Sequence, residues 1–214
     1  MKIISPSLLS LDFKNLIRDI NILNNIGVNR LHLDVMDGHF VPHLTFGPMI
    51  IKTIRSLTKS HLETHLMIEN PMDTIDQYIE AGSDTIIIHY EASNNPIKEL
   101  SHIRSSNLCA GIAINPDTHA NVIKELLEYL DYILIMSVYP GRGGQIFIND
   151  SINKMIEIKK ICTNHKIKLA VDGGVNLDTI NKIYKTGIDI VIAGSAIFNS
   201  KDNIQNNYNN LLNA

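Results

Sequence analysis

Four residues whose side chains bind metals and move protons stand at spacings that can bring them together. His32 and Asp34 are two residues apart in an apolar segment, so in a strand both side chains leave the same face. A His-x-Asp pair alone is more often a hydrogen-bonded structural pair. His65 and Asp172, however, each end another short apolar segment. Together the four residues predict a metal site of two imidazoles and two carboxylates.

This ligand set indicates a class of ion rather than a single element. Nitrogen and oxygen ligands suit zinc, ferrous iron, manganese and cobalt, and their softness does not choose among these metals. We therefore expect one divalent transition metal ion, held by His32, Asp34, His65 and Asp172.

Glycine-rich segments form a second candidate site. The segments 140–145, 173–174 and 193–195 each follow an apolar strand candidate. Any one glycine is more often part of a tight turn. Three such segments on adjacent strands favour a phosphate site, because glycine lets backbone N–H groups approach an anion.

The elements that must position these residues follow a repeated pattern. Short apolar segments recur about every 25 residues, and a stretch with helical periodicity follows each one, as in repeated βα units. Near-continuous Ile, Leu and Val suit strands that are buried on both faces. Eight strands are expected to begin near Ile3, Arg30, His61, Thr85, Leu108, Tyr132, Lys168 and Asp189.

The spacing of apolar residues between the strands, and the residues at expected helix starts and ends, agree with this pattern. Apolar residues recur at i, i+3 and i+4 between residues 13 and 23 and between residues 122 and 130. Asn-Pro pairs stand near expected helix starts at 70–71, 95–96 and 115–116. Expected helix ends coincide with Gly27, Gly82 and Gly187, and a final helix is expected between residues 203 and 214.

Eight βα units can form an open sheet or a closed barrel, and periodicity does not decide between them. The candidate ligands lie on the second, third and seventh strands. An open sheet in chain order would separate them by about 20 Å, whereas a barrel brings them together. The first turn also lacks the GxGxxG motif of dinucleotide-binding sheets. We therefore predict an α/β protein with a single (β/α)8 barrel over residues 1–214.

Composition limits the class of protein. The chain has 214 residues, 44% hydrophobic, and a formal net charge of −3 without long runs of one sign, so no nucleic-acid partner is expected. The N-terminal segment is a poor signal peptide, and no stretch reaches the length of a membrane span. We expect a cytoplasmic homo-oligomer that does not bind a membrane. Cys109 and Cys162 are interpreted as ordinary buried thiols.

Longer stretches of the chain resemble a known family. The segments 7–10 (SLLS), 32–42 (HLDVMDGHFVP), 44–48 (LTFGP), 65–67 (HLM) and 171–175 (VDGGV) resemble those of ribulose-phosphate 3-epimerases. The resemblance covers nearly the whole chain. It implies a (β/α)8 barrel isomerase of the pentose phosphate pathway that interconverts D-ribulose 5-phosphate and D-xylulose 5-phosphate.

The resemblance also implies roles for particular residues. His32, Asp34, His65 and Asp172 match the metal ligands, and the two aspartates match the catalytic acid and base. Two carboxylates on different strands can flank a planar ene-diolate and exchange protons with its two faces. The positions that match substrate-binding residues are Ser7, His65, Gly141, Arg142, Gly143, Gly144, Gly173, Gly174, Gly194 and Ser195.

The chain departs from the family pattern in three places, all of which bear on loop behaviour and affinity. Arg142 stands where phenylalanine is common, Tyr139 where a polar residue is usual, and His43 where asparagine is common. Arg142 either contacts the substrate phosphate or is simply solvated, and we favour the solvated interpretation because exposed charge pairs contribute only about 0 to 1 kcal/mol.

Several other residues have two interpretations. Met36, Met67 and Met136 either line the reacting centre or fill the core. His89 is either a further site residue or a hydrogen-bonded core histidine. Asp37, which precedes Gly38, is interpreted as a turn cap. His102, His119 and His165 are interpreted as solvated.

Three alternative functions deserve comparison. A D-allulose-6-phosphate 3-epimerase would use similar chemistry on a six-carbon sugar, although segments 44–48 and 141–145 look more like the pentose enzyme. An orotidine-phosphate decarboxylase would need an Asp-x-Lys-x-x-Asp array after the third strand, where this chain reads ETHLM without lysine. A non-catalytic sugar-phosphate-binding barrel is disfavoured because both aspartates and both histidines are present.

Overall fold

The computed structural model describes residues 2–214, which form alternating strands and helices. The strands are β1 (Ile3–Pro6), β2 (Arg30–Met36), β3 (His61–Met67), β4 (Thr85–His89), β5 (Cys109–Ile114), β6 (Tyr132–Met136), β7 (Lys168–Asp172) and β8 (Ile190–Ala193). The α-helices are α1 (Leu16–Asn25), α2 (Pro48–Leu57), α3 (Ile75–Glu80), α4 (Pro96–Ser105), α5 (Ser151–Ile161), α6 (Ile180–Tyr184) and α7 (Ile204–Asn213). Each expected strand begins within one residue of its predicted start.

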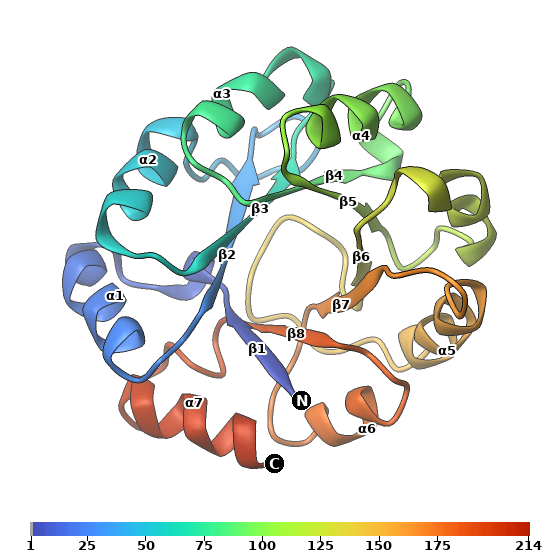
Figure 1. Cartoon of the computed structure of the whole chain (residues 1–214). Coiled ribbons are helices and arrows are strands. Elements are labelled where there is room, and N and C mark those ends of the chain that lie inside the picture. The colour runs from blue at the N-terminus through green and yellow to red at the C-terminus, as the bar shows by residue number, and fades with distance from the viewer. Residues whose placement is uncertain (1) are drawn as a thin grey trace.

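The strands form one parallel sheet that closes into the predicted barrel. Neighbours pair in the order β1-β8-β7-β6-β5-β4-β3-β2, and an isolated parallel bridge between Ser7 and His32 joins the two ends. In Figure 1 the strands form a ring, and the helices lie outside it. The closed barrel is therefore confirmed, and β2 and β7 are separated across the closure only by β1 and β8.

The barrel interior is polar on one side and apolar on the other. The polar side comes from β1 to β4 and consists of side chains that are at most 2% exposed: Ser5, His32, Asp34, Glu63, His65 and His89. The apolar side comes from β4 to β8 and includes Ile87, Ala113, Leu134, Met136, Ala170, Ile190 and Ile192. This division concentrates the ionisable groups where the metal ligands were expected.

The helices end largely as the sequence predicts. Gly27, Gly82 and Gly187 have φ angles of 79°, 95° and 86°, which favour glycine. The Val28 N–H donates to Leu23 O at 3.0 Å, and the Gly27 N–H donates to Asn24 O at 3.1 Å, so α1 ends in a Schellman motif. The predicted final helix is present as α7. Among the described residues, no helix has the length and apolar character needed to cross a membrane.

Two expectations about individual segments need correction. The segment with helical spacing before β6 is a 3-10 helix, η5 (Ala120–Tyr129), because its buried residues Ala120, Ile123 and Leu126 recur every three residues. Cys109 is exposed rather than buried, since it is the first residue of β5 at the amino-terminal rim of the barrel, while Cys162 is buried as expected.

Aspartates repeat at the amino-terminal rim of the barrel. Asp84, Asp131 and Asp189 each precede an even-numbered strand, and each carboxylate accepts a backbone N–H from the second residue of the preceding strand. The donor nitrogens are those of Leu62, Ala110 and Leu169, at 2.8, 3.0 and 2.9 Å. These bonds hold successive strands together below the site.

Replacing Asp189 tests this contribution. The variant Asp189→Ala leaves the buried Leu169 N–H without its carboxylate acceptor, and we expect the free energy of unfolding to fall by about 1 to 3 kcal/mol. Urea unfolding measures the change. Asp178→Ala is the control, because the exposed Asp178 carboxylate makes no hydrogen bond among residues 2–214, and its loss should cost less than about 0.5 kcal/mol. Equal effects of the two variants would contradict this role for Asp189.

Candidate active site

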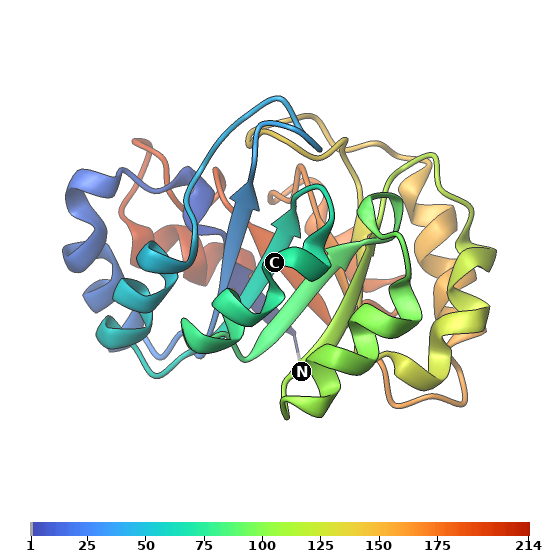
Figure 2. The same cartoon turned by 90° about the horizontal axis from the view of Figure 1, so that it is seen from above.

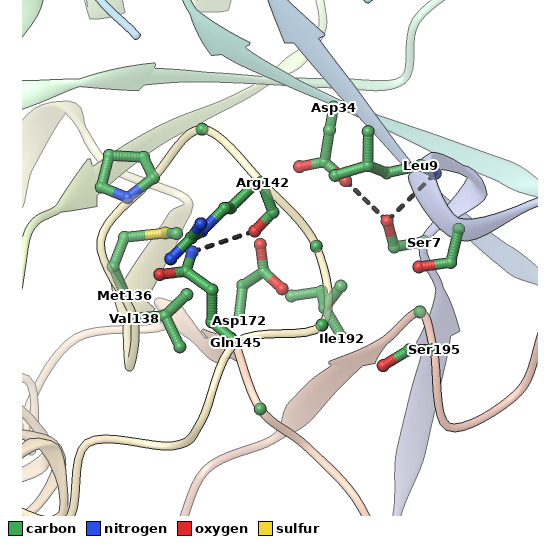
Figure 3. A pocket seen from close by; sticks show the side chains of 18 of the residues that line it. Ser7, Leu9, Asp34, Met136, Val138, Arg142, Gln145, Asp172, Ile192 and Ser195 are labelled. Carbon is green, nitrogen blue, oxygen red and sulfur yellow. Dashed lines mark hydrogen bonds between the residues drawn. The ribbon is translucent and has the colours of Figure 1, made fainter. Parts of the chain in front are cut away.

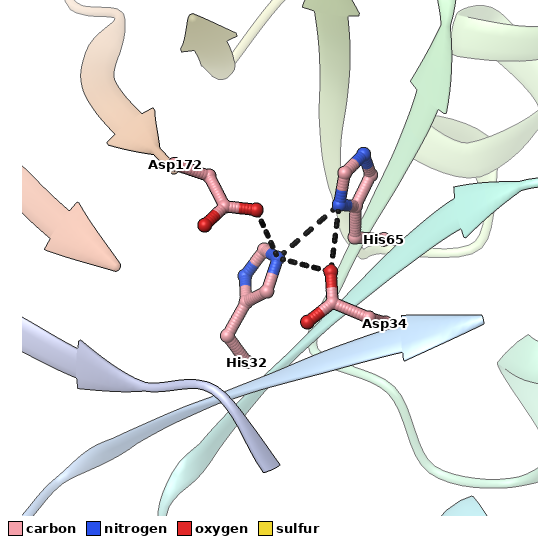
Figure 4. Close-up of side chains that lie close together, drawn as sticks. All are labelled: His32, Asp34, His65 and Asp172. Atoms are coloured by element: carbon pink, nitrogen blue, oxygen red, sulfur yellow. Dashed lines mark hydrogen bonds and ion pairs between the residues drawn. The ribbon is translucent and has the colours of Figure 1, made fainter. Parts of the chain in front are cut away.

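The four predicted ligands meet at the carboxyl ends of their strands (Figure 4). One ligand atom from each of His32, Asp34, His65 and Asp172 lies within 4.8 Å of the others. His32 Nε2 lies 3.3 Å from His65 Nδ1 and 4.0 Å from Asp172 Oδ2. Asp34 Oδ1 lies 3.1 Å from His65 Nδ1 and 3.3 Å from His32 Nε2. The predicted cluster is therefore assembled from β2, β3 and β7.

The donor chemistry of this cluster fits a bound cation. His32 Nδ1 lies 3.4 Å from Glu63 Oε2 and donates to it, while Nε2 faces the cluster. Burial lowers the pKa of His32, but the surrounding carboxylates, Asp34 first, outweigh it and raise that pKa in the metal-free protein, so a metal ion would take the place of the Nε2 proton. Asp34 Oδ1 and His65 Nδ1 face the same point. Electron-rich atoms this close repel one another unless a proton or metal ion lies between them, and the N2O2 set suits the divalent metals named above.

The pKa values of the two carboxylates in the cluster are shifted in opposite directions in the metal-free protein. Burial, reinforced by the nearby Asp34 carboxylate, raises the pKa of Asp172 to about 7. Burial alone would also raise the pKa of Asp34, but the His32 and His65 imidazoles outweigh it and hold that pKa far below its usual range. Burial lowers the pKa of His65 to about 4, which keeps this imidazole in the neutral form that binds metals.

Further hydrogen bonds fix the first carboxylate. Ser7 Oγ donates to Asp34 Oδ2 at 2.6 Å, leaving Oδ1 for the cluster. Ser7, Asp34 and Asp172 line a pocket with Met36, Met67 and Met136 (Figure 3). All three methionines are 2% exposed, so they both pack in the interior and face the pocket.

The glycine-rich loop after β6 covers this pocket. In Figure 1 it crosses the centre of the ring, and in Figure 2 it rises over the same end of the barrel as the loop after β2. A Cβ atom on Gly141 would lie 3.1 Å from Val41 Cβ, and one on Gly143 would lie 3.5 Å from Ser10 Oγ. Gln145 Nε2 donates to the carbonyl oxygens of Tyr139 and Arg142 at 2.7 and 2.9 Å, which braces the loop internally.

The other glycines allow close backbone approach beside the same pocket. Gly173 and Gly174 have φ angles of 115° and 62°, and a Cβ on Gly174 would lie 2.5 Å from the backbone nitrogen of Phe147. A Cβ on Gly194 would lie 2.5 Å from Ser10 Oγ. Within residues 2–214, the backbone N–H groups of Gly174 and Ser195 donate to no protein atom. The expected substrate-binding residues that line the pocket are Ser7, Gly141, Arg142, Gly143, Gly144, Gly173, Gly174, Gly194 and Ser195.

Comparison with known proteins identifies the family. Residues 3–198 match the model of the ribulose-phosphate 3 epimerase family. The chain belongs to this family. A Helicobacter pylori protein named ribulose-phosphate 3-epimerase is 41% identical over 201 residues, which cover 93% of this chain and 92% of that protein. The Bacillus subtilis protein of the same name is 38% identical over 202 residues, or 93% of each chain. The expected enzyme class, an isomerase acting on carbohydrates, follows from this membership.

More distant structures share the fold alone. The crystal structure of 3-keto-L-gulonate-6-phosphate decarboxylase from Vibrio cholerae is similar with a TM-score of 0.71 and 16% sequence identity. The similarity covers 99% of this chain and 96% of that one. It agrees with the barrel and says nothing about the reaction, so membership of the epimerase family depends on the closer sequences.

Sequence reasoning missed two acidic residues around the epimerase family site. Glu63 accepts from Ser5 Oγ and Arg30 Nη1 at 2.7 and 2.6 Å besides facing His32. It is two residues before His65 on β3, so the spacing argument that paired His32 with Asp34 would have found it. Glu91, by contrast, lies outside the strands and reaches the cluster only through His89.

The residues with two interpretations are now placed. His89 is fully buried and lies beside both His65 and Glu91, so it belongs to the hydrogen-bonded surroundings of the site. Asp37 caps its turn as predicted, since Oδ1 accepts the backbone N–H groups of His39 and Phe40 at 2.8 and 2.9 Å. His119 is exposed, whereas His102 and His165 are partly buried.

The opposite pKa shifts of the two aspartates give a stability test on metal-free protein. Asp172 keeps its proton in the folded state while the unfolded chain loses it, so its presence destabilises the fold increasingly from about pH 4 to pH 7. We expect Asp172→Asn to stabilise the protein, with an advantage that grows by roughly 2 to 3 kcal/mol between pH 5 and pH 8. Urea unfolding with a chelator present measures this advantage.

The matched variant Asp34→Asn should have the opposite sign. Because the pKa of Asp34 is lowered, its ionised form stabilises the fold above about pH 4, and this contribution disappears only as the pH falls below that value. Asp34→Asn should therefore destabilise the metal-free protein at pH 5 and at pH 8. Effects of the same sign for both variants would refute the asymmetry.

Proposed function

We propose that this chain interconverts D-ribulose 5-phosphate and D-xylulose 5-phosphate as one catalytic barrel over residues 1–214. The observation that carries the proposal is the convergence of Asp34 and Asp172 on one pocket, on strands separated by the barrel closure. Membership of the ribulose-phosphate 3-epimerase family supports the choice of substrate. Inversion at C3 requires removal of a proton beside a carbonyl and return of a proton to the opposite face, which suits two separate carboxylates.

The two carboxylates start the cycle in different protonation states. In one direction of the reaction the Asp34 carboxylate removes the proton, and the Asp172 carboxyl group, which reaches the same pocket from β7, returns one. After turnover their states are exchanged, and the reverse reaction uses them in exchanged roles. Ser7 holds Asp34 by its Oδ2 atom, which fixes the carboxylate against the reacting carbon.

The metal ion would be held by His32, Asp34, His65 and Asp172. When bound, a divalent transition metal such as zinc, ferrous iron, manganese or cobalt supplies Lewis-acid stabilisation of the negative charge that develops in the ene-diolate. The three methionines at the pocket wall present apolar sulfur that does not compete for the transferred proton.

The glycine-rich side of the pocket would bind the phosphate. Free backbone N–H groups at Gly174 and Ser195, together with the lining glycines of the covering loop, support this assignment. Ser7, His65, Gly141, Gly143, Gly144, Gly173 and Gly194 complete the proposed substrate contacts. Closure of the loop would exclude water from the ene-diolate.

The alternative substrate remains D-allulose 6-phosphate, which needs the same acid, base and metal. Family membership favours the pentose phosphate. The homo-oligomeric state and the cytoplasmic location stay predictions, as does the absence of nucleic-acid and membrane partners.

The acid–base assignment is tested by Asp172→Asn. An amide cannot hold and return the proton, so we expect kcat for ribulose 5-phosphate to fall by at least about 100-fold while the barrel remains folded. Native enzyme working in deuterated water should place deuterium at C3 of the product. The assay compares turnover of ribulose 5-phosphate and allulose 6-phosphate, before and after chelation.

Four results would each contradict part of the proposal. Near-native turnover by folded Asp172→Asn would remove the two-carboxylate mechanism. Product without label at C3 would exclude proton exchange there. Faster turnover of allulose 6-phosphate would replace the substrate, and full activity after complete removal of metal would remove the metal.

The charge of Arg142 offers a test of the phosphate end of the pocket. Arg142 lines the pocket, and within residues 2–214 its guanidinium forms no ion pair. We expect Arg142→Phe to raise KM up to about five-fold at low ionic strength, less at high ionic strength, and to change kcat little, because salt screens the lost attraction. Equal KM values for the two proteins at both salt concentrations would leave Arg142 as a solvated residue without a phosphate contact.

A further inference from the structure

A chain of hydrogen bonds leads from one proposed metal ligand to the edge of the barrel. His65 Nε2, the ring nitrogen that faces away from the cluster, lies 2.8 Å from His89 Nε2. His89 Nδ1 lies 3.1 Å from Glu91 Oε2. Both histidines are fully buried, and their rings stack with centroids 4.9 Å apart. The ring nitrogens of His65 and His89 therefore cannot bond to bulk water instead of to each other.

Glu91, at the far end of these hydrogen bonds, determines which atom is the donor in each of them. Glu91 Oε1 accepts the backbone N–H of Asn115 at 2.8 Å and the hydroxyl of Thr118. A backbone N–H can only donate, so Glu91 is an acceptor there, and its ionised carboxylate is an acceptor at Oε2 as well. His89 must therefore carry its proton on Nδ1 and present a lone pair at Nε2.

The same logic then fixes His65. Because His89 Nε2 accepts, His65 must donate from Nε2, and a neutral His65 has only one ring proton. Its Nδ1 is left with a lone pair, and Nδ1 is the atom that faces Asp34 Oδ1 and His32 Nε2. We call the hydrogen bonds His65–His89–Glu91 the relay. Without the relay, the His65 proton would lie on Nδ1, where it would donate to the Asp34 carboxylate and occupy the place of a metal ion.

We infer that His89 and Glu91 are positioning residues that hold His65 in the tautomer able to bind a metal through Nδ1. The inference depends on the metal site of the proposed function. His89 and Glu91 would orient the His65 ring proton away from the cluster, as Glu63 does for His32 through Nδ1. Neither His89 nor Glu91 touches the pocket that would hold the substrate.

A single isosteric change should reverse the relay. In Glu91→Gln, the amide oxygen must still accept from the Asn115 N–H, which turns the NH2 group toward His89 Nδ1. His89 then protonates on Nε2 and donates to His65 Nε2, which transfers the His65 proton to Nδ1. A metal ion would have to displace that proton.

The tautomer is measured on metal-free protein with 15N-labelled histidine by NMR, and zinc affinity by competition with a chelator. We expect the His65 proton on Nε2 in the native protein and on Nδ1 in Glu91→Gln, and a zinc dissociation constant about 10 to 100 times higher in the variant. An unchanged tautomer, or a dissociation constant within two-fold of the native value, would overturn the inference.

Two further variants complete the test. Asp76→Asn is the matched control, because it makes the same chemical change in the His102–Asp76 pair between α3 and α4 and should alter neither readout. His89→Phe keeps an aromatic ring beside Phe40 but removes the acceptor for His65. If Glu91→Gln does not fold, native-like zinc affinity of His89→Phe overturns the inference. Lack of zinc binding by the native protein would instead contradict the proposed function, while the metal-free tautomer comparison still decides the relay.

Discussion

The site depends on the burial of proton-accepting atoms that face one another. His32 Nε2, His65 Nδ1 and Asp34 Oδ1 lie 3.1 to 3.3 Å apart with almost no exposure to water. Such an arrangement costs free energy unless a cation lies among the atoms, so the surrounding structure must hold them in place against their repulsion. Strand pairing does this directly, since Asp34 pairs with His65 and His32 with Glu63 in the β2–β3 register.

The barrel lets this polar cluster coexist with an ordinary core. The residues of β4 to β8 that point inward are mostly Ile, Leu and Ala, and they fill the other side of the interior. Arg30 and Ser5 bind Glu63 beneath the cluster, and His32 and Arg30 together outweigh burial and lower the pKa of Glu63 to about 2. The negative charge of Glu63 is therefore balanced by Arg30 and His32 below the proposed metal site. The pocket opens at the carboxyl ends of the strands.

Those parts of the fold that depend on local sequence pattern could be predicted, and those that depend on distant contacts could not. The strand starts and the shared face of His32 and Asp34 follow from a period of two and from apolar runs, which are local. The same period of two places Glu63 on the face of β3 that carries His65, so its position could have been predicted as well. The roles of Glu91 and Tyr139 were not, because their partners Asn115 and Asp117 come from other loops. The exposure of Cys109 likewise depends on how the amino-terminal rim of the barrel is covered, which spacing alone does not reveal.

The positions at which this chain differs from the family pattern lie on exposed loops, away from the buried residues that would carry out the reaction. His43, Tyr139 and Arg142 are all exposed and lie in the loops after β2 and β6, while the ligands below them are buried. Tyr139 donates to the Asp117 carboxylate, which ties the covering loop to the segment that also supplies Asn115 and Thr118 to Glu91. Loop sequence can thus change how the pocket is covered without moving the strand-borne cluster. A substitution in such a loop should alter affinity for substrate before it alters proton transfer, because the aspartates take their positions and their opposite pKa shifts from the barrel itself.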